Sequence, residues 1–121
     1  MVATSVDRLR HISERIVAIR SLLADSTFDE AWRDATRWPA FERHIEVISE
    51  ASRSVPVEWK VAHGADIDWA KVAGIGSVLR HAYHHTSAPI LWDIFETHLD
   101  PLEAAIDRMI AAYSPASSPK P

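Results

Sequence analysis

Apolar residues recur every three or four positions along most of the chain, which is the period of an amphipathic helix. The clearest stripe lies in residues 5–23, where one face carries Leu9, Ile12, Ile16, Ile19 and Leu23. Charged residues fill the opposite face, as in a helix that packs one side against a bundle. The pattern predicts a first helix from Ser5 to Leu23.

A second helix is predicted from the turn at residues 24–27 to about Ser54. Ser26 is followed three residues later by Asp29, a spacing that resembles a capping box. Pro39 lacks a backbone donor and clashes with the preceding turn, so a kink or break is expected near Arg37–Trp38. After this break the apolar stripe continues through Phe41, Ile45, Ile48, Ala51 and Val55.

The middle of the chain is less regular. Pro56 suits the first position of a short helical segment, which His63–Gly64 would end. Asp68 is predicted to cap the next helix, which would run from Trp69 to about His85. The sequence of residues 86–89, Thr-Ser-Ala-Pro, predicts a stop and a restart, with Ser87 as a cap.

The last helix is predicted from Ile90 to Tyr113, with a bend at Pro101. Its inward-facing residues would be Leu91, Phe95, Leu99, Leu102, Ile106 and Met109. Trp38, Trp59, Trp69 and Trp92 are expected to pack in the core. Four main helices with short links predict an all-α fold, an antiparallel up-down bundle of four or five helices in residues 1–113. Residues 114–121 are rich in Ser and Pro and are predicted to be a disordered tail.

Composition narrows the functional classes. The chain has 121 residues and no Cys, which excludes a disulfide framework and thiolate chemistry. No apolar run approaches the roughly 20 residues of a membrane span, and the first eight residues are too polar for a secretory signal. We therefore expect a cytoplasmic protein without membrane contact. The net charge of -4 argues against indiscriminate nucleic-acid binding, so such a role requires a local basic patch.

Residues 74–85 contain the candidate for such a patch. This segment gathers Ser77, Arg80, His81, Tyr83, His84 and His85 in three helical turns. In one continuous helix, His81 and His85 would share a face, as would Arg80 and His84. A long side chain on a helix leans toward the N-terminus, so the Arg80 guanidinium is expected to lie over Gly76. A fixed positive charge, an imidazole and a phenol would then lie on neighbouring faces.

Each of these residues also has a structural interpretation. His81 can simply bond to a neighbour, Tyr83 can be a half-buried bundle residue, and His84 and His85 can be solvated. The spacing of His81 and His85 also permits metal chelation on a helix. Neither Cys nor a His-Glu-X-X-His motif accompanies the pair, so no metal site is predicted. Glu50 and Asp68 are interpreted as surface and capping residues.

Several features follow one another in the order of a known family. They are Glu50-Ala51, Ser54-Val55-Pro56, Ile67-Asp68-Trp69, Gly74, Arg80-His81-Ala82-Tyr83, Leu91-Trp92 and Leu99-Asp100-Pro101-Leu102. In this order and spacing the chain resembles the HepT-like family of HEPN-domain proteins, from about residue 6 to residue 110. The resemblance implies a HEPN-type bundle that forms a homodimer.

The resemblance also implies a function. Members of this family are typically metal-independent ribonuclease toxins without a cofactor, and a minimal nucleotidyltransferase antitoxin transfers AMP to them. Their motif is Arg, four residues, His, one residue and Tyr, which places the last two on His81 and Tyr83. His81 would transfer the proton and Tyr83 would accept AMP. Ser77, Tyr83, His84 and His85 would contact the RNA substrate.

The chain departs from this motif at one position. The motif's Arg falls on Gly76, and the Asn that usually follows it falls on Ser77. One hypothesis is that Arg80 supplies the missing charge, because RNA cleavage without a metal needs a cation beside the acid and the base. A second is a catalytically silent HEPN module that binds a nucleotide, RNA or a nucleotidyltransferase. A third is a helical protein with a purely structural role.

Overall fold

The computed structural model describes residues 4–81 and 84–114, and it describes residues 84–87 by their backbone alone. Within this part the chain is helical and contains no strand. The elements are α1 (Ser5–Leu23), α2 (Phe28–Arg33), α3 (Arg37–Ser52), α4 (Val57–His63), α5 (Trp69–His81), α6 (His84–Asp93), the π-helix η1 (Ile94–His98) and α7 (Leu99–Tyr113). The predicted all-α fold is confirmed, and α1 has the predicted bounds.

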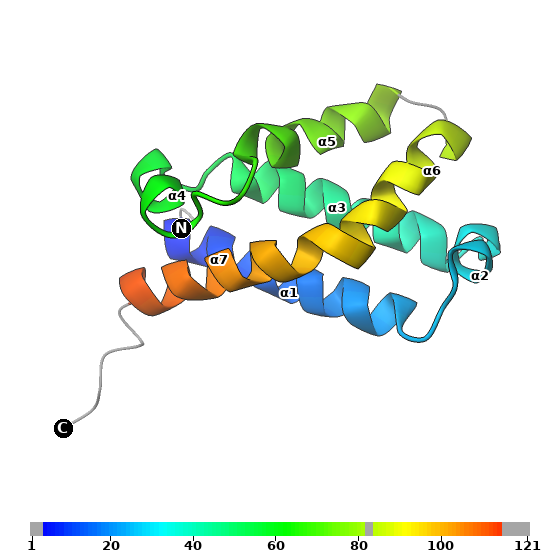
Figure 1. Cartoon of the computed structure of the whole chain (residues 1–121), viewed down its shortest axis with the longest axis horizontal. Helices are drawn as coiled ribbons and strands as arrows, with labels where there is room; N and C mark the ends of the chain where they lie inside the picture. The colour runs from blue at the N-terminus through cyan, green and yellow to red at the C-terminus, as the bar shows by residue number, and fades with distance from the viewer. Residues whose placement is uncertain (1–3, 82–83, 115–121) are drawn as a thin grey trace.

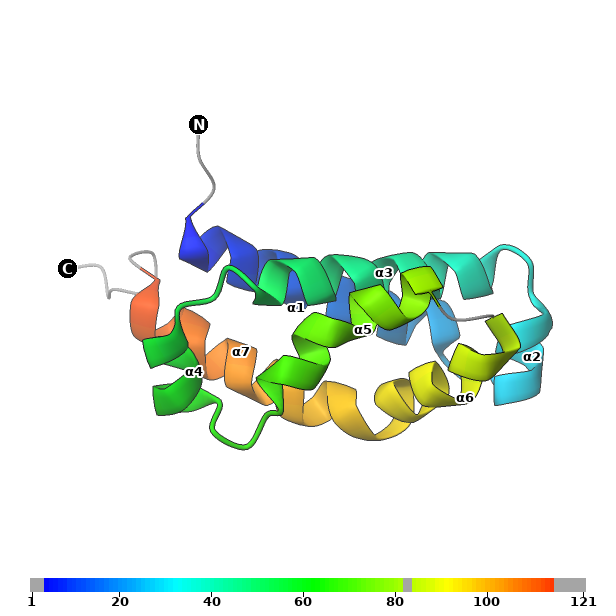
Figure 2. The ribbon, with the colours of Figure 1, turned by 90° about the horizontal axis from the view of Figure 1, so that it is seen from above.

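The long helices alternate in direction, as an up-down bundle requires (Figure 1). Helix α3 runs back along α1, α5 lies on α3, and the arm formed by α6, η1 and α7 returns so that α7 packs on α1. The short helices α2 and α4 lie at opposite ends of the bundle (Figure 2). Helix α5 therefore lies on one side of the molecule, with α3 beneath it.

The predicted apolar stripes form the core. Fully or almost fully buried side chains include Leu9, Ile12, Ile16, Ile19, Leu23, Phe41, Ile45, Ile48, Ala51, Val55, Leu91, Leu99, Leu102, Ile106 and Met109. Phe95 is only partly buried, as are Trp59, Trp69 and Trp92, while Trp38 is 2% exposed. All of these side chains pack in or against one hydrophobic cluster.

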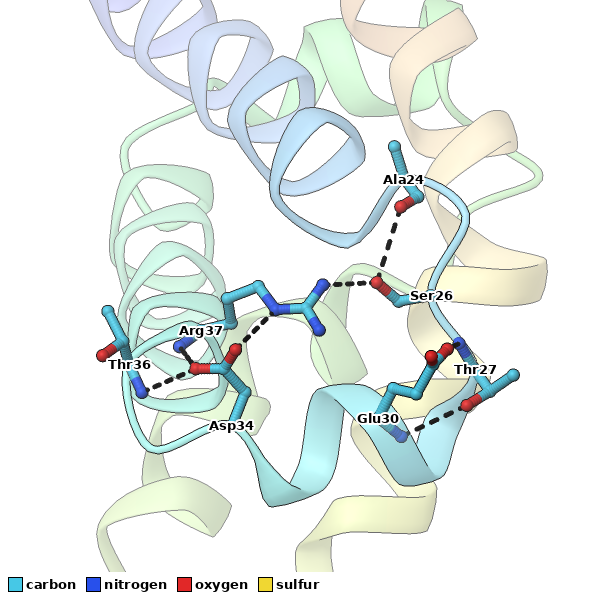
Figure 3. Close-up of polar contacts among 7 residues, drawn as sticks. All are labelled: Ala24, Ser26, Thr27, Glu30, Asp34, Thr36 and Arg37. Atoms are coloured by element: carbon cyan, nitrogen blue, oxygen red, sulfur yellow. Dashed lines mark hydrogen bonds and ion pairs between the residues drawn. The ribbon is translucent and has the colours of Figure 1, made fainter.

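The start of α2 differs from the prediction by one residue. The capping box is formed by Thr27 and Glu30: Thr27 Oγ1 accepts from the Glu30 amide at 3.2 Å, and the Glu30 carboxylate accepts from the Thr27 amide at 2.9 Å (Figure 3). Ser26, predicted for this role, instead contacts the Arg37 guanidinium. Both residues are plausible caps, and only Thr27 has a glutamate at the third helical position.

The predicted break before Pro39 is confirmed, but it lies slightly earlier. Helix α2 ends at Arg33 and α3 begins at Arg37. Asp34 joins the two, since its carboxylate accepts from the Thr36 and Arg37 amides and from Arg37 Nε, each at 2.9 Å (Figure 3). Pro39 lies in the first turn of α3, where a missing backbone donor costs little.

The predicted stop at residues 86–89 is wrong. Helix α6 runs through this segment, with Ser87 and Pro89 inside it. Proline in a helix interior forfeits one backbone hydrogen bond. The neighbouring Ala88 and Leu91 are 1% and 0% exposed, so packing against the core favours the helix despite that loss.

The predicted continuous last helix is also corrected. It is interrupted by η1 at Ile94–His98, just before Pro101, which is the third residue of α7. The Leu99 amide bonds to the Ile94 carbonyl, and the Thr97 hydroxyl lies 2.5 Å from the Asp93 carbonyl. In this segment, backbone hydrogen bonds that span five residues and a side-chain hydrogen bond thus replace some of the regular α-helical hydrogen bonds.

The two ends of the described chain meet at one end of the bundle. Arg10 Nη2 in α1 donates to Ser114 Oγ at 2.6 Å, directly after α7. The rest of the predicted tail, residues 115–121, lies outside the described residues. No helix in the described part is long and apolar enough to span a membrane.

Candidate functional site

Helix α5 positions the candidate residues, and its start is fixed by local hydrogen bonds. The predicted cap at Asp68 is confirmed: its carboxylate accepts from the Lys71 amide at 3.1 Å, and its carbonyl accepts from the Val72 amide. The Trp69 indole donates to the Gly64 carbonyl at 2.9 Å and so ties α5 to the end of α4.

At Gly76, α5 lies directly against Ser49 of α3. The hydroxyl of Ser49, a buried residue of α3, accepts from the Gly76 amide at 3.1 Å and donates to the Ala73 carbonyl at 2.9 Å. A Cβ atom at position 76 would lie 3.0 Å from Ser49 Oγ, which is tighter than an ordinary contact. Glycine at this position therefore permits the hydrogen-bonded approach of the two helices.

The Arg80 guanidinium lies over Gly76, as the helix geometry predicts. Its Nη1 atom is 3.4 Å from the position that a Cβ atom of residue 76 would occupy. Arg80 is exposed, and its side chain forms no hydrogen bond or ion pair with the side chains and backbone that the structure describes. The structure thus places an exposed positive charge on the outer face of α5, above Gly76.

Ser77 and His81 continue this surface. Both are exposed, and they lie four residues apart, so their side chains follow one line along α5. His81 is the last residue of the helix, about 100° around the axis from Arg80. The structure thus brings Ser77, Arg80 and His81 to one outer end of α5.

His84 and His85 do not belong to this helix, because they lie in α6. Helix α5 ends at His81 and α6 begins at His84, so the predicted continuation to His85 is wrong. The shared faces expected for His81 with His85, and for Arg80 with His84, do not follow from the observed elements. Tyr83 lies outside the described residues, and so do the side chains of His84 and His85. Their roles stay predictions.

Arg53 is a further cation at the contact between α3 and α5, and the sequence analysis missed it. Its Nη2 atom donates to the Ala73 carbonyl at 2.8 Å. Glu50, interpreted from the sequence as a surface residue, is exposed and approaches Arg53 Nε at 3.9 Å. No local pattern signals the position of Arg53, because it depends on the antiparallel packing of α3 against α5.

A groove of about 590 Å³ opens on the other side of α5. It is lined mainly by apolar side chains of α3, α5, α6, η1 and α7, including Ile45, Ile48, Val72, Ile75, Val78, Ile90, Ile94, Leu99 and Leu102. Neither Arg80 nor His81 lines it, so the groove and the candidate site are separate surfaces. In the described part of the chain, no group of three His, Cys, Asp or Glu side chains is placed to hold a metal ion.

Comparison with known proteins identifies the family. Residues 12–109 match the family described as ribonuclease HepT-like. The chain is 27% identical over 103 residues to a protein of Thermococcus cleftensis named "Probable ribonuclease HepT", covering 85% of this chain and 93% of that protein. It is 24% identical over 102 residues to a protein of Caldanaerobacter subterraneus subsp. tengcongensis named as a "Putative RNase", covering 84% and 90%.

A protein of Methanocaldococcus jannaschii that is also named as a "Putative RNase" is 31% identical over 86 residues, which is 71% of this chain and 70% of that protein. No solved structure gives a significant match. The matched region, residues 12–109, extends from within α1 to within α7 and so covers at least part of every element of the bundle. The chain belongs to the HepT-like ribonuclease family.

Proposed function

We propose that this protein is a metal-independent ribonuclease that acts as a homodimer. The observation that carries the proposal is that the guanidinium of Arg80 lies over Gly76. Arg80 is also the residue directly before His81 in the sequence. Arginine suits phosphate because its planar group forms paired hydrogen bonds to two oxygens. Histidine can accept or donate a proton near neutral pH. Together they form half of the set of groups that RNA cleavage requires.

The reaction would use the 2′-hydroxyl of the RNA as the nucleophile. One His81 takes the proton of this hydroxyl, the bond from O2′ to phosphorus forms, and the bond from phosphorus to O5′ breaks. A second imidazole protonates the departing O5′. Arg80 stabilises the charge that builds on the phosphate oxygens. Because each chain supplies one His81, a two-fold dimer with α5 at its interface would supply the pair.

The test compares Arg80→Ala and His81→Ala with wild type in RNA cleavage by the purified protein in the presence of EDTA. Arg80→Ala is expected to lower the rate by roughly 10²–10³, the usual effect of losing one group that stabilises a developing oxyanion. His81→Ala removes the base and the acid of the dimer together, and general acid–base catalysis typically contributes about 10²–10⁴. The matched controls are Arg33→Ala and His11→Ala, two exposed residues on other helices, which should cleave at the wild-type rate. Wild-type cleavage by His81→Ala, or a protein that stays monomeric in light scattering, would contradict the proposal.

We also propose that the chain is the toxin of a toxin–antitoxin pair and that its partner transfers AMP to Tyr83. An added AMP brings a negative charge, which would repel RNA phosphates from the neighbouring Arg80 and His81. Co-expression with a minimal nucleotidyltransferase should give a mass increase that Tyr83→Phe removes. Tyr113 is the matched control, because it is the only other tyrosine in the chain and it stacks on Trp59 at 4.0 Å. AMP that persists in Tyr83→Phe would refute this assignment.

The second candidate function is a catalytically silent module that binds a nucleotide, RNA or a nucleotidyltransferase. Gly76 favours it, because a glycine stands where the family motif has its arginine. Its test is to restore an arginine at this position. Because a Cβ atom there would lie 3.0 Å from Ser49 Oγ, Gly76→Arg should be combined with Ser49→Ala. An inactive wild type and an active double variant would support the silent module. An active wild type would exclude it.

A further inference from the structure

Arg53 extends from α3 to the main chain of α5 and is held there on one side only. Its Nη2 atom donates to the Ala73 carbonyl at 2.8 Å, and the same carbonyl accepts from the Ser49 hydroxyl at 2.9 Å. The Arg53 side chain is 50% exposed. One edge of its guanidinium is therefore anchored to protein, and much of the group faces solvent.

Arg53 and Arg80 lie close together along α5, although they come from different helices. Ala73, Ser77 and Arg80 are spaced by four and three residues, so they form one stripe of the helix. Arg53 contacts this stripe at Ala73, and Arg80 folds back to Gly76. The two contact points are three residues apart, which is about 5 Å along the axis.

The charge of this pair is only partly neutralised. Glu50, at 3.9 Å, is the single ion-pair partner of Arg53 in the described part of the chain, and its side chain is 79% exposed. Arg80 has none there. Two neighbouring guanidinium groups repel each other unless an anion lies between or beside them. Their placement along the exposed Ser77 suits a chain of phosphates.

We propose that Arg53 is a substrate-binding residue that contacts an RNA phosphate next to the one held by Arg80. The RNA strand would follow the outer edge of the contact between α3 and α5, from Arg53 past Ser77 to His81. This inference rests on the proposed ribonuclease function and extends its site to a second helix. Because Arg53 contacts α5 two turns before His81, it would bind the strand without touching the reacting phosphate.

Two substitutions separate this role from a structural one. Arg53→Lys keeps the positive charge but loses the planar group, whereas Arg53→Gln keeps an amide donor for the Ala73 carbonyl and loses the charge. In RNA cleavage Arg53→Gln should raise KM severalfold with little change in kcat, while Arg53→Lys should stay near wild type. The slope of log binding constant against log salt concentration should fall by about 0.7–0.9 in Arg53→Gln, the value for one lost phosphate contact.

The matched control is Arg33→Gln, since Arg33 is an exposed arginine on α2 that pairs with Asp29. It should leave both KM and the salt slope unchanged, and thermal unfolding should show that every variant folds. A wild-type salt slope and KM in Arg53→Gln, with active wild-type enzyme, would overturn the inference alone. Weak binding by Arg53→Lys together with normal binding by Arg53→Gln would also overturn it. If the wild type neither binds nor cleaves RNA, the proposed function itself fails.

Discussion

The two sides of α3 hold the molecule together in different ways. Its core side carries Trp38, Phe41, Ile45 and Ile48, which are at most 3% exposed. Its α5 side carries Ser49 and Arg53, which form hydrogen bonds to the backbone of α5. The first side buries large apolar side chains. On the second side, polar contacts and the absence of a side chain at Gly76 add to the packing of partly buried apolar residues of α5 against the core.

The two sides of α3 should therefore contribute to different properties: one to the stability of the fold, the other to the position of α5. Full burial of a large apolar side chain contributes about 1.5–3 kcal/mol, whereas a typical hydrogen bond contributes about 0.5–1.5 kcal/mol. The core side of α3 should therefore dominate the free energy of unfolding. Hydrogen bonds are directional, so the α5 side should instead fix the register of α5 on α3 and with it the place of Arg80.

Phe41→Ala should have the largest effect, because it removes a fully buried ring from the core side. Phe41 is 0% exposed and packs edge-on against Trp38 at 5.1 Å between ring centroids. A loss of about 3–5 kcal/mol in the free energy of unfolding is expected from denaturant titration. Val17→Ala is the control, since Val17 is 58% exposed and should cost less than about 0.5 kcal/mol. A loss below about 1 kcal/mol for Phe41→Ala would refute this account of the core.

Ser49→Ala should have an intermediate effect, because it removes two hydrogen bonds from the α5 side without opening a large cavity. The Ala73 carbonyl keeps its bond from Arg53, so the expected loss is about 1–2 kcal/mol in the same titration. Ser77→Ala, at an exposed position of the same contact, should be close to neutral. If Ser49→Ala were as costly as Phe41→Ala, the distinction between the two sides of α3 would fail.

A change of pH should give the smallest effect, through His44 on α3. Burial, and then the nearby Arg15, lower the pKa of His44. Arg15 Nη1 can only donate, so His44 Nδ1 accepts this bond, at 3.2 Å, in the neutral state. Below the unfolded pKa of about 6.5, the unfolded chain binds a proton that the folded protein does not, so stability falls with falling pH.

The measurement is the free energy of unfolding of wild type and His44→Gln between about pH 7.5 and pH 5.5. The variant should show a smaller decrease over this range. His11→Gln is the matched control, because His11 is exposed on α1 and its replacement should leave the wild-type slope. If the free energy of unfolding fell equally with pH in wild type and His44→Gln, His44 would not be the source of the pH dependence.

The elements that sequence analysis predicted well are those set by local patterns. Helix α1 was predicted to the residue because its apolar stripe is regular and polar residues flank it. The position of Arg80 over Gly76 also follows from local geometry, since both lie on one helix. The capping box was misplaced by one residue because Ser26 and Thr27 are both plausible caps.

The elements that were missed depend on contacts between distant segments. Pro89 suggested a stop, but burial of the neighbouring Ala88 keeps α6 helical. Arg53 carries no motif, and its place beside the candidate site exists only because α3 and α5 pack in one register. The hydrogen bond between Ser49 and Gly76 joins residues 27 positions apart, and no helical period predicts it.

The hydrogen bond between Arg10 and Ser114 has a practical consequence for attaching other groups to this protein. It holds the start of α1 and the end of α7 at the same end of the bundle (Figure 2). Helix α5 runs away from that end, and His81 is its last residue, so His81 lies toward the opposite end of the bundle. An affinity tag or a surface linkage attached beside the start of α1 or the end of α7 would therefore lie at the end of the bundle that faces away from His81.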